Sequence, residues 1–285
     1  MTRSDHVTIG FLGPVSPSGP EPGCGEAQIH LAIPLESPFK RMVLVVQDFV
    51  LLSGRAVANI FQRPHYWSDV ILQMDNIGIG SVPIVLLTGF FAGAVLALQM
   101  FDTLATFGAA AQTGRMVSLS LVLEMGPVLT SLMVAGRNSA GIASELGSMT
   151  VTEQIDAMRA LGTDPVKKLV TPRLLATLVM LPLLTIIADF VGVFGGSVIA
   201  YFFIKQSPTQ YWTASYRSLD FADVAQGLVK PFAFAFIIAL VGCYCGLRTR
   251  GGTQGVGRST TQAVVSASML IFFIDFLITK IFVRA

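Results

Sequence analysis

Charged residues are scarce in this sequence. Only 13% of its 285 residues are Asp, Glu, Lys or Arg, whereas 53% are hydrophobic. Because about a quarter of the residues of a soluble domain are charged, this composition excludes an ordinary soluble globular protein. The net charge of +2 gives no reason to expect a nucleic-acid partner. We therefore expect an integral membrane protein.

Cysteine and histidine are also rare. The three cysteines, Cys24, Cys243 and Cys245, form no C-x-x-C motif, and the three histidines are scattered without metal-ligand spacing. We expect no disulfide framework, no metal site and no cofactor on this chain. A membrane-embedded lipid enzyme is a weaker alternative, because the apolar stretches contain no histidine or metal cluster.

Long apolar stretches are abundant. Five of them approach or exceed the roughly 20 residues that cross a bilayer. They cover residues 76–101, 116–135, 174–204, 228–247 and 259–280. We predict an all-α membrane protein with five transmembrane helices in a domain over residues 76–285. With the N-terminus inside, 13 of the 19 Lys and Arg residues lie on the cytoplasmic side, which predicts a cytoplasmic N-terminus and an outer C-terminus.

Two segments precede the first span. Residues 1–38 are rich in Gly, Pro and Ser and are predicted to be a disordered tail. Residues 39–63 carry an apolar stripe that charged residues interrupt, which favours an amphipathic helix in the membrane interface. Tyr66 and Trp67 are suitable interface anchors, and residues 39–75 are therefore predicted to be interfacial helices.

Small residues recur at a spacing of four in two spans. Gly89 and Gly93 do so in the first, and Gly192 and Gly196 in the third. Such ladders predict helices whose backbones approach closely. On the outer side, residues 206–223 are predicted to contain an interfacial helix. Asp220 is then placed to cap the next helix, which would begin before Lys230.

A polar helix is predicted between the second and third spans, over residues 150–162. Thr150 and Glu153 form a T-x-x-E capping box, and Gly162 suits a left-handed C-cap. The body, residues 151–161, makes about 16 Å of helix, too short to cross a membrane. Its apolar face holds Val151, Ile155, Met158 and Leu161, and Glu153, Asp156 and Arg159 lie away from that face. This face needs a partner, and the spacing leaves open whether that is the membrane surface or a cytoplasmic protein.

Ionisable residues interrupt the apolar stretches at few positions. Glu124, Asp189 and Asp275 lie within predicted spans, and Lys230 lies at a predicted outer end. Each costs about 2.5–3.5 kcal/mol at mid-membrane, so we expect pairing or contact with a wet cavity. A purely structural role in joining helices remains the alternative.

A near match to a phosphate-binding loop occurs at residues 252–259. The stretch reads GTQGVGRS, with Arg258 where the required lysine would stand, and it follows a membrane helix rather than a strand. We predict a cytoplasmic loop without a nucleotide site.

Several stretches resemble one protein family. Residues 123–176, LEMGPVLTSLMVAGRNSAGIASELGSMTVTEQIDAMRALGTDPVKKLVTPRLLA, resemble the signature region of the MlaE/YrbE phospholipid permeases. LPLLTIIADFVGVFGG (181–196), GVGRSTTQAVV (255–265) and DFLITKIF (275–282) are further matches. Asp156-Ala157-Met158 followed by Gly162 also resembles the coupling motif of ABC importer permeases. The resemblance covers about residues 40–285.

The resemblance implies a homodimeric ABC transporter permease in the bacterial inner membrane. Residues 150–162 would be its coupling helix, resting in a groove of a separate ATPase that binds ATP and Mg²⁺. The complex would move phospholipid between the membrane and an outer MCE-type lipid-binding subunit, often with a STAS-type subunit, and so contribute to outer-membrane lipid asymmetry. A proton-driven secondary transporter using Glu124 and Asp189 is the alternative, although no inverted repeat is evident.

The resemblance also suggests site residues. Glu124 and Lys230 match positions around the family's lipid cavity, and Leu104 and Phe107 match apolar positions there. Leu123 stands where members of the family often carry an arginine. Asp189 and Asp275 are expected to be structural. The coupling contact would involve Val151, Glu153, Ile155, Asp156, Met158, Arg159, Leu161 and Gly162.

Overall fold

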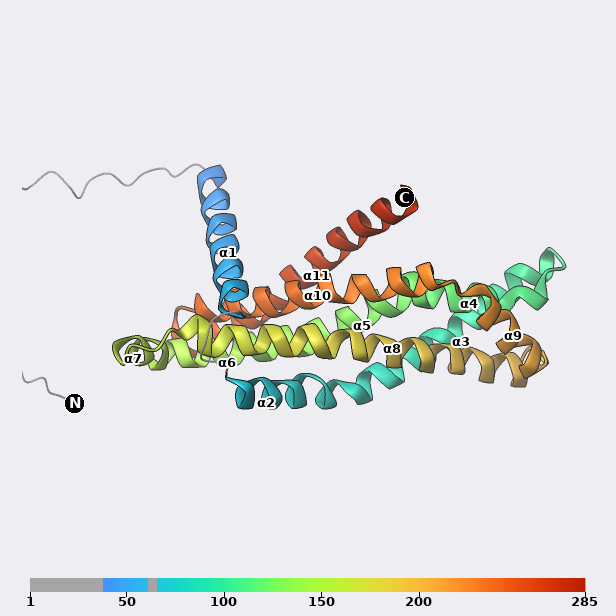
Figure 1. Ribbon diagram of the computed structural model, residues 1–285, viewed down its shortest axis with the longest axis horizontal. Coiled ribbons are helices and arrows are strands. Elements are labelled where there is room, and N and C mark those ends of the chain that lie inside the picture. Colours follow the sequence, from blue (N-terminus) through green and yellow to red (C-terminus); the bar gives the residue numbers. More distant parts are fainter. Residues whose placement is uncertain (1–37, 61–65, 285) are drawn as a thin grey trace, which may run out of the picture. The chain divides into compact units, whose positions relative to one another are not determined.

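The fold is built from helices, as the composition predicts (Figure 1). The computed structural model describes residues 38–60 and 66–284, and these residues contain no strand. The predicted tail over residues 1–38 therefore lies almost wholly outside the described residues. The helices are α1 (Pro38–Ile60), α2 (Trp67–Ile77), α3 (Val82–Thr106), α4 (Thr113–Ser120), α5 (Gly126–Val134), α6 (Ala140–Val151), α7 (Gln154–Ala160), α8 (Thr171–Phe202), α9 (Pro208–Ser218), α10 (Phe221–Leu247) and α11 (Gly252–Arg284).

Six helical stretches of the described residues, rather than five, are long and apolar enough to cross a membrane. The additional one is residues 43–60 of α1, with a mean hydropathy of 1.5 and only 6% of its length buried. Charged side chains are spaced widely enough there for length and composition to permit a span. The interfacial position of α1 and the opposite placement of the two termini thus stay predictions.

Three wide π-helical turns occur in two long helical stretches, residues 110–151 and 166–202. They are η3 (Leu121–Met125), η4 (Ala135–Ser139) and η5 (Val166–Val170). Pro127 follows η3 and lacks the backbone N–H that an α-helical turn would use, which explains the local widening. The second predicted span is consequently part of a helical stretch that continues over residues 110–151.

Glycines bring α3 and α8 into close contact, as the small-residue ladders predict. A Cβ atom on Gly89 would lie 2.9 Å from the Ala188 carbonyl oxygen, and one on Gly192 would lie 3.1 Å from the Gly89 carbonyl oxygen. Gly93 faces the backbone of Gly192 even more closely. Larger side chains would force these helices apart.

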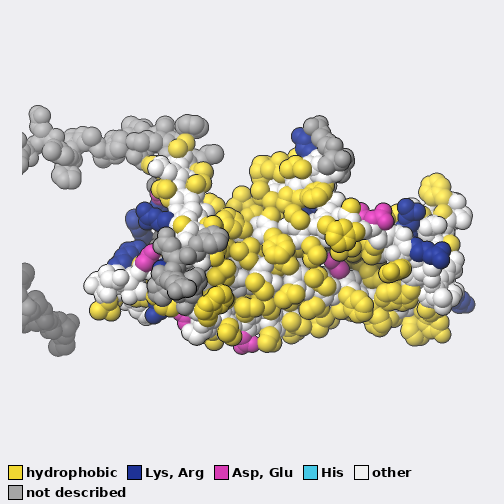
Figure 2. Space-filling view, viewed as in Figure 1, with side chains coloured by type: hydrophobic (Ala, Val, Ile, Leu, Met, Phe, Trp, Pro, Cys, Tyr) yellow, Lys and Arg dark blue, Asp and Glu magenta, His cyan; other side chains and the backbone are white. Residues whose placement is uncertain are grey.

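Helix α10 runs through the core. Asp220 and Asp223 form a capping box at its start, which confirms that the helix begins before Lys230 and leaves Pro231 inside it. Phe234, Ile238 and Val241 of α10 share one core cluster with residues of α5, α8 and α11. Across the middle of the face shown in Figure 2, hydrophobic side chains predominate, and Lys and Arg gather towards its ends.

Residues 252–258 are helical. The chain turns through left-handed Gly251 and Gly252 and α11 begins at Gly252. The expected loop at the near match to a phosphate-binding motif is therefore wrong, because this stretch is the first turns of a membrane-length helix. That geometry also lacks the strand–loop–helix arrangement of a nucleotide-binding loop.

Candidate functional site

A fully buried lysine joins three elements. Lys230 of α10 has no exposed side-chain surface, and its Nζ lies 2.5 Å from Glu124 Oε2 of η3 and 3.0 Å from Asp275 Oδ1 of α11. Thr279, one turn after Asp275, donates a hydrogen bond of 3.0 Å to Glu124 Oε1. One ammonium group thus bridges two carboxylates from segments far apart in the sequence.

These four side chains form a charged cluster within membrane-length helices. A lysine buried without a partner would carry a large desolvation cost, so the two carboxylates account for its burial. The cluster is not closed, because the Glu124 side chain keeps 41% of its surface exposed whereas Asp275 keeps 18%. With two acids and one base it holds one formal negative charge, and Glu124 is its accessible member.

Lys230, which the sequence places near the outer end of a span, lies well inside a helix. It is the tenth residue of α10, which begins at Phe221, so it lies about 13 Å along the helix. At this position its side chain meets that of Glu124. Pairing among the ionisable residues of the spans was expected, and Asp275, for which a structural role is predicted, contacts the same lysine. Its spacing to Thr279, one helical turn, is a signal that sequence reasoning missed.

Leu104 and Phe107 lie at the end of α3. Leu104 is half-buried, whereas Phe107 caps the helix and is 80% exposed. Neither residue belongs to the lysine cluster. Their place in a lipid cavity remains a prediction from the family resemblance.

Asp189 occupies a different position from the lysine cluster. It lies in α8 against Gly126, and its carboxyl group fills the space that a side chain at Gly126 would need. Its Oδ1 has no hydrogen-bond partner among the described residues. The structural role of Asp189 stays a prediction.

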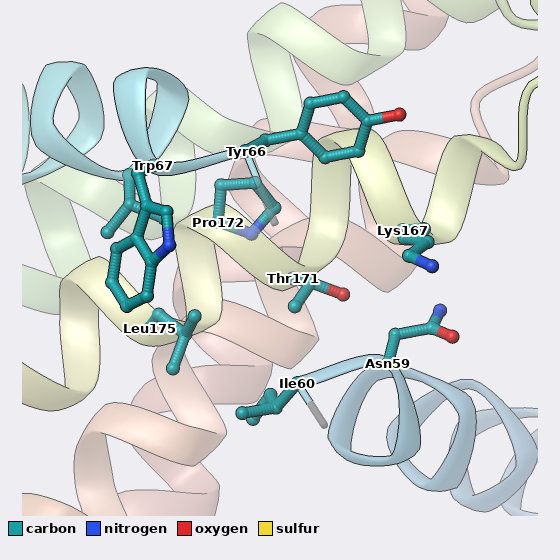
Figure 3. A pocket seen from close by; sticks show the side chains of 9 residues that line it. Asn59, Ile60, Tyr66, Trp67, Lys167, Thr171, Pro172 and Leu175 are labelled. Atoms are coloured by element: carbon teal, nitrogen blue, oxygen red, sulfur yellow. The ribbon is translucent and has the colours of Figure 1, made fainter. Parts of the chain in front are cut away.

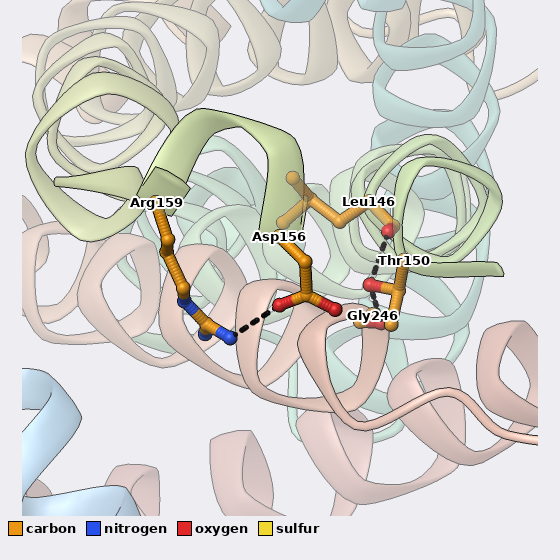
Figure 4. Close-up of polar contacts among 5 residues, drawn as sticks. All are labelled: Leu146, Thr150, Asp156, Arg159 and Gly246. Atoms are coloured by element: carbon orange, nitrogen blue, oxygen red, sulfur yellow. Dashed lines mark hydrogen bonds and ion pairs between the residues drawn. The ribbon is translucent and has the colours of Figure 1, made fainter. Parts of the chain in front are cut away.

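The segment between the second and third predicted spans is built differently from the expected helix over residues 150–162. Helix α6 continues through Val151, so Thr150 does not cap anything. Instead, its Oγ1 donates to the carbonyl oxygens of Leu146, at 2.8 Å, and Gly246, at 3.3 Å (Figure 4). Glu153 adopts left-handed backbone angles, with φ of 58°, and α7 starts at the next residue in the sequence. The T-x-x-E pattern therefore does not form a capping box here.

The predicted four-residue apolar face is also not formed. Val151 belongs to α6, while Ile155 of α7 is only 4% exposed and lies in a core cluster against which Met158 packs. The outward side of α7 carries Glu153, Asp156 and Arg159, and the following Leu161 is 83% exposed. The packing partner of the apolar face is thus mainly the protein itself.

The end of α7 agrees with the sequence. Gly162 has a φ of +77°, and its N–H and that of Thr163 donate to the carbonyl oxygens of Arg159 and Met158, both at 3.0 Å. These are the two bonds of a Schellman C-cap. Arg159 also pairs with Asp156 at 2.8 Å on the exposed surface (Figure 4). An exposed pair of this kind contributes little to stability, so both charges remain available to a partner.

A small pocket lies beside the start of α8. Tyr66, Trp67 and Lys167 line it together with Asn59 of α1, and Thr171 forms part of its wall (Figure 3). Lys168 lies over the Tyr66 ring, 6.0 Å from its centroid. Aromatic rings beside lysines are typical of the membrane–water boundary, which agrees with the predicted interface anchors.

Comparison with known proteins identifies the family. The family model described as Permease MlaE matches residues 70–281. The chain belongs to the MlaE permease family. The match covers all of the lysine cluster and all of α7, and it begins within α2.

Curated relatives of this MlaE-family chain are permeases. A probable ABC transporter permease protein from Rickettsia felis is 45% identical over 239 residues, covering 84% of this chain and 92% of the relative. One from Synechocystis is 39% identical, covering 85% and 90%. The intermembrane phospholipid transport system permease protein MlaE from Haemophilus influenzae is 31% identical over 244 residues, covering 83% and 94%.

These findings identify an ABC transporter permease that passes the membrane several times. Permease subunits of ABC transporters are not themselves enzymes. In such transporters an ATPase partner is the general rule, and this chain offers α7 and its surroundings as protein surface outside the long apolar helices.

Proposed function

We propose that this protein is the permease subunit of a phospholipid ABC transporter. It would move phospholipid between the bacterial inner membrane and an outer MCE-type lipid-binding subunit, and so contribute to outer-membrane lipid asymmetry. The name of the Haemophilus influenzae relative supports phospholipid as the substrate. The further partners in this proposal are a second copy of the chain, a cytoplasmic ATPase that binds ATP and Mg²⁺, and a STAS-type subunit.

The observation that carries the proposal is the lysine cluster. Lys230 is buried among membrane-length helices, yet one of its two partners, Glu124, stays accessible. A phosphate group can replace a carboxylate as the partner of an ammonium ion, because both are anions that accept strong hydrogen bonds. The lipid phosphate would thus bind Lys230 as Glu124 turns away, without leaving the lysine unpaired.

The same arrangement explains how an apolar cavity could accept a charged headgroup. Moving an isolated phosphate into the membrane would carry a large desolvation cost. Lys230 lowers that cost only if the phosphate replaces the Glu124 carboxylate as its partner, because a third anion beside Lys230 would be repelled by the two carboxylates. Thr279, which binds the other oxygen of Glu124, would hold the carboxylate in its resting position.

Coupling to ATP hydrolysis is proposed at α7. Asp156, Arg159 and Leu161 present exposed charge and one exposed apolar side chain, while Ile155 anchors the segment in the core. We place this end of the helices, and the N-terminus, on the cytoplasmic side. The opposite end, which holds α9, then faces outwards.

The test compares Lys230→Gln with Lys205→Gln, an exposed lysine outside the cluster. Each variant is purified with its ATPase partner in lipid nanodiscs, and bound phospholipid is counted by mass spectrometry. We expect Lys230→Gln to lose at least half of its bound lipid and Lys205→Gln to lose none. Equal lipid retention by both variants would remove the lysine cluster from the binding site.

A second arm separates this function from proton-driven transport. Lipid transfer between reconstituted membranes is measured with ATP present while an ionophore removes the proton gradient. The ABC permease should keep its full rate. A rate that falls with the gradient would favour a secondary transporter instead.

A further inference from the structure

A polar cleft lies at the end of the molecule that holds α9. It has a volume of about 770 Å³, within the range of small-molecule sites, and is formed by η2 (Ala110–Gln112), α4 and α9. Arg115 of α4 and Arg217 of α9 both line it. The lysine cluster does not contribute to this cleft, so it is a separate feature of the protein.

The frame of the cleft is tightly built. Ser215 donates a hydrogen bond of 3.0 Å to the carbonyl oxygen of Gly114, and Ser118 and Ser218 hydroxyls lie 3.2 Å apart. Gly114 leaves room for the backbone of Tyr211, which a side chain there would displace. These contacts flank Arg115 and Arg217 in the sequence, so both arginines project from helices whose separation is fixed.

Neither arginine has an interaction partner among the described residues. Both are exposed, and neither guanidinium takes part in an ion pair or hydrogen bond with another described residue. Asp220, the acid that lines the same cleft, instead caps α10 through its side chain. The cleft therefore presents two unpaired cations and hydroxyl and amide groups, which together suit an anion with several acceptor oxygens.

The location of the cleft indicates which class of anion it would bind. Trp212 and Tyr216 of α9 are exposed on the helix that forms one wall, and Trp212 lies beside Phe190 of the membrane-length helix α8, with ring centroids 6.5 Å apart. Exposed Trp and Tyr beside an apolar helix mark the headgroup level of a membrane. The phosphate of a phospholipid lies at this level.

We propose that Arg115 and Arg217 bind the phosphate of a phospholipid as it enters or leaves the protein at this end. This site rests on the proposed function, since it gives phospholipid a second contact, on α4 and α9, in addition to the lysine cluster on η3, α10 and α11. Its ligand chemistry is a phosphodiester with an apolar tail lying along α8. Free phosphate shares the charged group but not the tail.

The experiment uses the full chain in nanodiscs with its ATPase partner. Arg115→Gln, Arg217→Gln and the double variant are compared with Lys205→Gln, which removes a cation from the neighbouring loop outside the cleft. The probe is phosphatidylglycerol carrying a photoreactive headgroup, and crosslinking to α4 and α9 is read by peptide mass spectrometry. We expect about fivefold less crosslinking for each single variant and no change for Lys205→Gln.

Three controls decide the outcome. Diacylglycerol, which lacks the phosphate, should not crosslink, and millimolar inorganic phosphate should compete only weakly. Equal crosslinking by the double variant would overturn the site, as would full competition by inorganic phosphate, which indicates a free-anion site. Loss of a protein subunit from the double variant with crosslinking retained would also overturn it, because the arginines would then bind that subunit.

The two proposals fail differently. If the unaltered protein carries no phospholipid and transfers none, the proposed function fails. If it carries and transfers phospholipid but the cleft variants crosslink normally, only the cleft site fails.

Discussion

Replacing Lys230 by Met removes the only positive charge of the lysine cluster while keeping most of the side-chain volume. Glu124 and Asp275, 2.5 and 3.0 Å from the ammonium group, would then face each other without a cation. Removing one partner of a buried ion pair costs about 3–5 kcal/mol. For a protein of this size that corresponds to a fall of roughly 6–20 °C in the unfolding temperature.

The assay is a double-mutant cycle followed by thermal unfolding in one detergent. Asp275→Asn in the Lys230→Met background removes one of the two stranded carboxylates, so it should recover part of the lost stability. The same Asp275→Asn change in the unaltered protein should destabilise it, because Lys230 loses a partner. The sign of the Asp275 effect thus depends on the lysine, and the difference is the coupling energy.

Lys205→Met is the matched control, since Lys205 is exposed and forms no ion pair among the described residues. It should leave the unfolding temperature within about 2 °C. The reasoning would be refuted if Lys230→Met unfolded at the same temperature as Lys205→Met. It would also be refuted if Asp275→Asn had the same effect in both backgrounds.

Three further predictions concern other parts of the protein. Gly93→Ala should lower the free energy of unfolding by more than about 1 kcal/mol, because its Cβ meets the backbone of Gly192. Gly141→Ala in α6, with open space around it, should be neutral or stabilising in the same thermal unfolding assay. Similar effects of the two changes would argue against close packing of α3 and α8. Leu161→Asp should weaken copurification of the ATPase several-fold at unchanged thermal stability, whereas Ile155→Asp should lower stability itself, and normal ATPase binding by Leu161→Asp would remove this residue from the contact. Asp189→Asn should preserve folding and lipid transfer, because the acid has no cationic partner in the described structure; loss of transfer with normal folding would instead support a proton path through Asp189.

The sequence predicts well where local chemistry alone decides the structure. The glycine ladder of α3 and α8, the start of α10 at Asp220 and the C-cap at Gly162 all follow from small side chains or backbone hydrogen bonds within a few residues. The family is predicted for a related reason, since its signature stretch is continuous in the chain. Such features need no knowledge of which helices are neighbours.

Features that depend on neighbouring helices are harder to predict. Thr150 has the right spacing to Glu153 for a cap, yet α6 continues through it, and its hydroxyl group donates to the carbonyl oxygens of Leu146 in the same helix and Gly246 of α10. The meeting of Lys230, Glu124 and Asp275 likewise depends on the relative depth of three helices. The burial of Ile155 in α7 likewise depends on other helices, because its core cluster draws residues from α1, α6, α8 and α10.

Pro231 stands directly beside Lys230 in the interior of α10. Because proline has no N–H, the carbonyl of Gly227 loses its usual partner, and the helix is mechanically softest at this point. From there to Gly246, which accepts the Thr150 hydrogen bond, α10 is an unbroken rod of about 24 Å. The missing backbone hydrogen bond thus lies directly beside Lys230, so the ion cluster is located where α10 resists bending least.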